Sequence, residues 1–190
     1  MFQSEFPLHT VIEDEFWTAK QRDGHSLHEI SYRACYKPQL PAFFIDRYSP
    51  PGGTVYDPFM GRGTTLVEGK LRGRHVAGND TNPVSAVLTE PRLDPIDFAR
   101  IRERLETIEL PSAEIEDESL LVFFAPGTLR ELYGWRAYFR ERQTGAVFDH
   151  TDAWLRMVAC NRLTGHSKGF FSVYTLPPNQ ATSVKAQQRI

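Results

Sequence analysis

Thr54-Val-Tyr-Asp-Pro-Phe-Met-Gly-Arg-Gly-Thr-Thr65 is the stretch that decides the fold of this 190-residue chain. A short β-forming run ends at an acid, Asp57, and a tight turn with Gly61 and Gly63 leads into a helical pattern. In α/β proteins, ligands bind beyond the carboxyl ends of the strands, where such turns lie. Glycines let the backbone approach a ligand closely, and a carboxylate binds amines or hydroxyls. The stretch therefore predicts an α/β fold with a ligand site after this strand.

The residues after the turn complete a βαβ unit. Leu66, Val67 and Leu71 recur at helical spacing from Thr64 onward. Gly73 is placed to end this helix, and residues 75–78 then predict a second buried strand. Such a unit implies two parallel strands joined by a right-handed crossover.

The glycine pattern discriminates between ligand classes. A dinucleotide fingerprint requires a third glycine three residues after the second, but Leu66 stands there. A phosphate-binding loop requires Gly-Lys-Ser/Thr, but Gly63 is followed by Thr64. Both classes are therefore disfavoured. A strand-turn-helix whose glycines serve packing alone is the structural alternative.

The remaining pattern, Asp-Pro-Phe-x-Gly-x-Gly-Thr-Thr over residues 57–65, closely resembles the S-adenosylmethionine-binding motif of DNA amino-methyltransferases. These enzymes act on adenine N6 or cytosine N4. The resemblance implies a Rossmann-like methyltransferase core, with a parallel-rich sheet in three layers, and a helical addition. It implies that Asp57 binds the methionine amine and that Thr64 and Thr65 present hydroxyls and helix amides to the methionine carboxylate. The remaining motif residues would shape the pocket: Pro58, Phe59, Gly61 and Gly63.

Two further segments agree with this cofactor. Asp80 follows the second predicted strand, near the spacing of about 20 residues at which an acid commonly holds ribose hydroxyls. The resemblance gives Asp80 the same task and places Asn82 near the adenine, whereas a strand-end turn is the alternative role. Upstream, Lys37-Pro38 resembles an element that lines the methionine end of the pocket. Pro38 can equally serve to start a helix.

A complete catalytic element is missing from the sequence. An amino-methyltransferase needs Asp, Asn or Ser, then Pro-Pro and an aromatic residue, to hold the amine and stack on the flipped base. Residues 49–51 read Ser-Pro-Pro but Gly52 follows, and residues 176–178 read Leu-Pro-Pro with Asn179 next. We therefore assign no catalytic residue. We expect the cofactor-binding half of a split or truncated enzyme, whose catalytic motif is carried by a second subunit.

The distribution of charge along the chain indicates which partners it could contact. The net charge of −2 does not by itself indicate nucleic-acid binding, but residues 153–190 contain five basic and no acidic side chains. This asymmetry predicts contacts with double-stranded DNA or with an acidic partner surface, although an ordinary solvated surface would look the same. Such contacts are expected from the cations and the histidine of this segment and of the glycine turn: Arg62, Arg162, His166 and Lys168.

The sequence disfavours a metal-binding, a secreted or a membrane protein. His25 and His28 have no third metal-type residue nearby, so we expect no metal. The two cysteines, Cys35 and Cys160, form no Cys-x-x-Cys pair, and reduced thiols predict a cytoplasmic protein. Residues 1–15 are acidic and interrupted by Pro7, which is typical of neither a signal peptide nor a membrane span.

Three regions are expected. Residues 1–94 would form the S-adenosylmethionine-binding half of the core, and residues 95–162 a mostly helical insertion for target recognition or subunit contacts. Residues 163–190 would complete the core or contact the partner or DNA. The expected function is methyl transfer to an exocyclic amine of DNA, as in restriction-modification systems. A non-catalytic S-adenosylmethionine-binding regulator and an RNA methyltransferase are the alternatives.

Overall fold

The computed structural model describes residues 13, 24–30, 32 and 35–163. Contacts divide the chain into two compact units. The first ends at Met60 and resumes over Thr64–Asn79, and the second comprises Gly61–Gly63 and the chain from Asp80 onward. His166 and Lys168, like the rest of the predicted basic segment after Leu163, lie outside the described residues.

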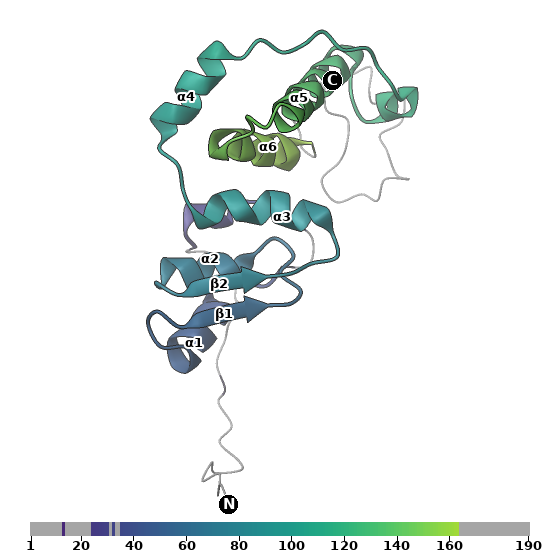
Figure 1. Cartoon of the computed structure of the whole chain (residues 1–190). Coiled ribbons are helices and arrows are strands. Elements are labelled where there is room, and N and C mark those ends of the chain that lie inside the picture. The colour runs from purple at the N-terminus through teal and green to yellow at the C-terminus, as the bar shows by residue number, and fades with distance from the viewer. Residues whose placement is uncertain (1–12, 14–23, 31, 33–34, 164–190) are drawn as a thin grey trace, which may run out of the picture. The chain divides into compact units, whose positions relative to one another are not determined.

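The first unit is built on a pair of parallel strands, β1 (Thr54–Asp57) and β2 (His75–Gly78), shown in Figure 1. Their register runs from Thr54 opposite His75 to Asp57 opposite Gly78. Helix α2 (Thr64–Leu71) connects them, and α1 (Gln39–Tyr48) and the short 3₁₀ helix η1 (Ser26–His28) precede them. The predicted βαβ unit is confirmed. The additional strands of a three-layer Rossmann-like core are not among the described residues, so that finer expectation stays a prediction.

Helix α2 packs closely on the two strands. Leu66 and Val67 are almost completely buried, at 2% and 1% exposure. A Cβ atom at Gly69 would lie only 2.7 Å from Val76 Cγ1, so a side chain at this position would push the helix away from the sheet. On its other side, α2 is joined to η1 by the buried pair of Glu68 Oε1 and His28 Nε2, 2.6 Å apart. His28 thus serves packing in the first unit.

Residues 75–78 form a strand, as predicted, but the prediction that this strand is buried is wrong. Val76 is half-buried, while His75, Ala77 and Gly78 are exposed. The reason is that α2 covers one face of the pair and the described residues of this unit supply no layer on the other. Strands of parallel sheets are normally covered on both faces.

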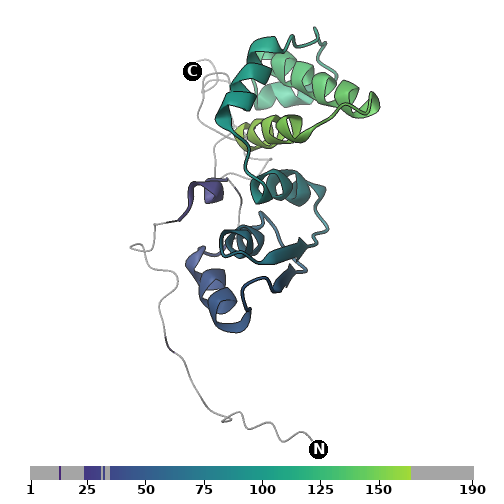
Figure 2. The same ribbon diagram turned by 60° about the vertical axis from the view of Figure 1, so that its left-hand side comes forward.

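The second unit is helical over its described residues. It contains α3 (Pro83–Thr89), α4 (Phe98–Thr107), α5 (Pro126–Thr144) and α6 (His150–Arg162), which Figure 2 shows in colours from teal to yellow-green. Two 3₁₀ helices, η2 (Glu90–Leu93) and η3 (Glu118–Val122), lie between them. The apolar run at residues 120–124, which periodicity alone leaves open between strand and helix, largely falls in η3.

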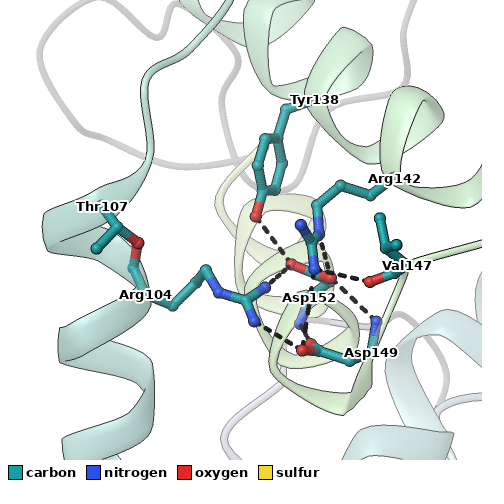
Figure 3. A network of polar contacts seen from close by, with 7 residues as sticks. All are labelled: Arg104, Thr107, Tyr138, Arg142, Val147, Asp149 and Asp152. Atoms are coloured by element: carbon teal, nitrogen blue, oxygen red, sulfur yellow. Dashed lines mark hydrogen bonds and ion pairs between the residues drawn. The ribbon is translucent and has the colours of Figure 1, made fainter. Parts of the chain in front are cut away.

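A buried carboxylate joins three helices of the second unit (Figure 3). Asp152 in α6 is fully buried, and its Oδ1 accepts hydrogen bonds from Arg104 Nη1 of α4 at 2.6 Å and Tyr138 OH of α5 at 2.9 Å. Its Oδ2 accepts from Arg142 Nε of α5 at 2.5 Å and from the Asp149 backbone N–H at 3.0 Å. The last bond belongs to a capping box that begins α6.

The network predicts a large loss of stability in Asp152→Asn, because the change removes the charge that balances two partly buried arginines. We expect unfolding in urea to show a loss of about 3 kcal/mol. Glu116→Gln is the control, since Glu116 pairs with Arg136 on the surface. That change should cost at most about 1 kcal/mol. Equal losses in the two variants would contradict the role given to Asp152.

Candidate cofactor site

Three segments of the first unit converge where β1 ends. The Asp57 carboxylate accepts a hydrogen bond from the Phe59 N–H through Oδ1 at 3.0 Å and one from Tyr36 OH through Oδ2 at 3.3 Å. The Tyr36 hydroxyl also hydrogen-bonds Thr65 Oγ1, in the first turn of α2. The backbone carbonyl of Asp57 meanwhile accepts from the Asn79 N–H at 2.9 Å. The predicted residues Asp57 and Thr65 are therefore brought together, and Tyr36 links them.

The start of α2 supplies further donors at this position. The helix begins at Thr64, which is buried at 3% exposure, while Thr65 is half-buried. The first amides of an α-helix have no partner within the helix. They point along the helix axis at its positive end, which attracts anions. A carboxylate, hydroxyls and helix amides thus occur within one short stretch of chain.

Four residues that were predicted to line the cofactor pocket lie next to Tyr36 or Asp57 in the sequence, and their exposure differs. Pro58 is exposed, and the Phe59 side chain is 84% exposed. Pro38 is the N-cap residue of α1, so it does start a helix, and the Lys37 side chain is exposed beside it. Lys37 and Pro38 nevertheless directly follow Tyr36, which places them next to the residue that contacts Asp57.

In the second unit, the glycine turn is held by Asp80. Its Oδ2 accepts from the Gly61 N–H and its Oδ1 from the Asn82 N–H, both at 2.8 Å. The backbone hydrogen bonds, from Asn82 first and Gly61 second, lower the pKa of Asp80. The Asn82 side chain also caps α3 by accepting from the Val84 N–H at 3.1 Å. The sequence left two roles open for Asp80, and the observed hydrogen bonds are those of the second role, a turn at the end of a strand.

The backbone of the turn requires glycine at Gly63. This residue has a φ of +77°, and a Cβ would lie 2.3 Å from Thr89 Cγ2. The preceding residue, Arg62, is half-buried, and its carbonyl accepts a hydrogen bond from the Arg92 guanidinium. Arg92 is 2% exposed and also donates from Nε to the Leu88 carbonyl at 2.6 Å. Burial first, and the charge of Arg62 second, lower the pKa of Arg92 to about 10.

Sequence reasoning missed two residues that organise these segments. Tyr36 adjoins the Lys37-Pro38 pair, so its place in the chain was a usable signal, although its hydroxyl partners come from distant segments. Arg92 gave no signal, because a lone arginine after a short helix is more often on the surface.

Arg162, which was predicted to contact DNA or the partner, lies exposed at the end of α6.

The described residues offer neither a metal site nor a membrane span. They contain no group of three or more His, Cys, Asp or Glu residues that could hold a metal ion. No helix among them is both long and apolar enough to span a membrane.

Residues 8–89 match the model of the DNA methylase family of N6 and N4 amino-methyltransferases. This region of the chain is therefore similar to that family, in agreement with the family predicted from the glycine motif. The match includes β1, the glycine turn, α2, β2 and α3. Whether the enzyme is split or truncated stays a prediction.

Curated relatives agree with this family. The chain is 36% identical over 87 residues to type II methyltransferase M.MvaI of Kocuria varians, which covers 44% of this chain and 19% of the relative. It is 33% identical over 101 residues to type II methyltransferase M.MjaII of Methanocaldococcus jannaschii, covering 53% and 19%. It is 30% identical over 92 residues to type II methyltransferase M.BsoBI of Geobacillus stearothermophilus, covering 45% and 18%. The matches thus span about a fifth of each relative. No solved structure matches the chain.

The geometry of the turn predicts that Gly63→Ala destabilises the protein more than Gly52→Ala does. Both glycines have φ near +75°, but a Cβ at Gly52 would meet nothing within 4 Å. We expect a cost of about 1 kcal/mol for Gly52→Ala from backbone strain alone. Overpacking against Thr89 should add about 1–3 kcal/mol in Gly63→Ala. Thermal unfolding of the two variants measures this difference, and equal midpoints would show that the turn can move away from Thr89.

Proposed function

We propose that this chain binds S-adenosylmethionine for an enzyme that methylates an exocyclic amine of DNA, adenine N6 or cytosine N4. The observation that supports it most is the convergence of Tyr36, Asp57 and Thr65 at the carboxyl end of β1, inside the region matched to DNA methylases. Parallel α/β folds bind ligands at this end of their strands. Methyltransferases of this family take their methyl group from S-adenosylmethionine.

The polar groups around β1 fit the amino-acid end of this cofactor, which carries an ammonium and a carboxylate. The Asp57 carboxylate can accept hydrogen bonds from the ammonium, directly or through water. The hydroxyls of Thr64 and Thr65 and the first amides of α2 can donate to the carboxylate. Tyr36 would keep Asp57 and Thr65 in the arrangement that both tasks need. The ammonium of the ligand would thus face a carboxylate, and the carboxylate of the ligand would face hydrogen-bond donors.

The other predicted residues receive supporting roles. We assign the lining of the pocket to the residues that flank these groups along the chain: Lys37, Pro38, Pro58, Phe59, Gly61 and Gly63. We assign Asp80 to the ribose hydroxyls. Each of its oxygens accepts one backbone hydrogen bond, and a carboxylate oxygen has a second lone pair for a further donor. Asn82 would lie at the adenine.

Bound S-adenosylmethionine would supply a methyl group activated by its sulfonium charge. Asp57, Thr64 and Thr65 would hold the cofactor by its amino-acid end, and the cofactor would donate this methyl to the amine nitrogen of the base. This chain would contribute positioning, because a methyl held in line with a fixed amine reacts as in an intramolecular step. The base must leave the duplex to reach the site. Catalytic residues are not assigned to this chain.

We propose that a second polypeptide supplies the Asp/Asn/Ser-Pro-Pro-aromatic element and that both act on double-stranded DNA in the cytoplasm. Each of the three relatives extends well beyond the matched fifth of its length. We assign the contacts with DNA or the partner to Arg62, Arg162, His166 and Lys168. A non-catalytic regulator is the alternative, because it also predicts the incomplete catalytic motifs at residues 49–52 and 176–179. Methylation of DNA in the presence of the partner separates the two.

The proposal predicts that Asp57→Asn weakens cofactor binding in calorimetric titration of the purified chain with S-adenosylmethionine. A hydrogen bond to a charged group contributes about 1.5–3 kcal/mol, so we expect a loss of roughly 10- to 100-fold in affinity. Asp46→Asn is the control, because Asp46 is an exposed carboxylate of the same unit that pairs with Arg72. Equal affinities for all three proteins, or no binding by the folded wild-type chain, would contradict the assignment of Asp57.

Tyr36→Phe separates positioning from packing at the same site, because it removes the hydroxyl and keeps the ring. With Asp57 and Thr65 no longer linked, we expect affinity for S-adenosylmethionine to fall by about 5- to 10-fold, the value of one ordinary hydrogen bond. Tyr48→Phe is the matched control, since the Tyr48 side chain is 69% exposed. The same titration decides: an unchanged affinity in Tyr36→Phe would show that Asp57 and Thr65 need no link.

A further inference from the structure

A buried cation donates hydrogen bonds to the glycine turn from within the second unit. Arg92, in η2, is 2% exposed, and η2 contacts both α3 and α6. Its guanidinium donates from Nε to the Leu88 carbonyl at 2.6 Å and from Nη2 to the Arg62 carbonyl, in the middle of the turn. Burial of a charged group is unfavourable unless hydrogen bonds compensate it. The methyl transfer proposed above gives this buried charge no task.

The two glycines of the turn are fixed by the same part of the chain. Asp80 Oδ2 accepts a hydrogen bond from the Gly61 N–H at 2.8 Å. Gly63 lies against the buried side chain of Thr89, because a Cβ atom at Gly63 would be only 2.3 Å from Thr89 Cγ2. Arg92 therefore binds the residue between two fixed neighbours, and its bond determines the direction of that residue's carbonyl.

The direction of the Arg62 carbonyl also sets the direction of the next amide. A trans peptide group is planar, and its C=O and N–H bonds point in opposite directions. Because this carbonyl points to Arg92, the Gly63 N–H points away from Arg92. Within the described part of the chain this N–H has no hydrogen-bond acceptor, although Gly63 is buried. Buried amides almost always have a partner in native proteins. The Gly63 amide is therefore a donor that a bound ligand can satisfy.

We propose that Arg92 is a positioning residue of the cofactor site, which holds the peptide between Arg62 and Gly63 so that the Gly63 amide donates to bound S-adenosylmethionine. The guanidinium suits this task because it is planar and its donors have fixed relative directions. The bond to Leu88 orients the plane, and the plane directs Nη2 at the turn. Arg92 acts through the backbone of the turn rather than on the cofactor itself. Its role in binding rests on the proposed function.

The charge of Arg92 and its geometry can be separated by substitution. Burial first, and the charge of Arg62 second, lower the pKa of Arg92 only to about 10, so the side chain keeps its proton at neutral pH. A lysine would also be charged, but it carries one ammonium on a flexible chain and cannot reproduce two bonds in a fixed plane. Arg92→Lys therefore removes the planar geometry and keeps the charge.

The test compares calorimetric titrations of the full chain with S-adenosylmethionine, at a temperature at which circular dichroism shows each variant folded. Arg92→Lys should lower the affinity about tenfold, because the Gly63 amide is no longer held in one direction. Asp152→Asn is the matched control. It disturbs a buried charge network of the same unit, and the hydrogen bonds of Asp152 go to α4, α5 and the start of α6. Its affinity should stay within about twofold of wild type.

Two results of these titrations would overturn the inference. An unchanged affinity in Arg92→Lys would show that the turn needs no planar donor. An equal loss of affinity in Asp152→Asn would show that the loss follows from reduced stability of the unit and not from the position of the turn.

Amide hydrogen exchange of the wild-type chain tests the same claim without a substitution, which keeps it testable if Arg92→Lys does not fold. Saturating S-adenosylmethionine should slow the exchange of the Gly63 amide at least about tenfold. The Gly61 amide is the internal control, since it is already bound to Asp80 and should change less. Equal slowing of the two amides, or no change at Gly63, would contradict the assignment.

Exchange in the absence of cofactor separates this inference from the proposed function. Arg92→Lys should speed the exchange of the Gly61 amide at least about fivefold, because the turn is held less firmly. If this difference appears but the wild-type chain binds no cofactor, Arg92 holds the turn, and the proposed function fails together with the role of Arg92 in binding. If wild type and Arg92→Lys bind the cofactor equally, the proposed function stands and the inference alone fails.

Discussion

The close packing of α2 on the parallel pair of β1 and β2 is the constraint on which the first unit depends. Gly69 leaves room for Val76, and the nearly buried Leu66 and Val67 fill the space between helix and strands. Because α2 must start within a few residues of the end of β1, the chain has to turn tightly after Asp57. That turn places a carboxylate and the amides of a helix N-terminus together, and a zwitterionic ligand needs both.

The same constraint accounts for one face of the sheet. The contacts of α2 cover one face of two short strands, and within the described residues β1 pairs with β2 alone. Two-stranded sheets are marginally stable unless other elements pack on them.

The βαβ unit could be predicted from sequence, because its apolar spacing and glycines act locally. The elements β1, α2 and β2 therefore appear where the pattern places them. The burial of β2 could not be predicted, because it depends on which layers of structure cover the βαβ unit from outside. For the candidate site, Asp57 and Thr65 carry a local motif and were found. Tyr36 and Arg92 were missed because their roles arise from contacts with residues 21 to 30 positions away.

The most direct test of the central claim is a nuclear magnetic resonance titration of the isotope-labelled chain with S-adenosylmethionine. The largest changes in amide chemical shift should fall on Tyr36 and on residues 57–65, with smaller changes in the helices of the second unit. Shift changes confined to α5 and α6, or none at saturating cofactor, would contradict the claim that the turn after β1 is the cofactor site.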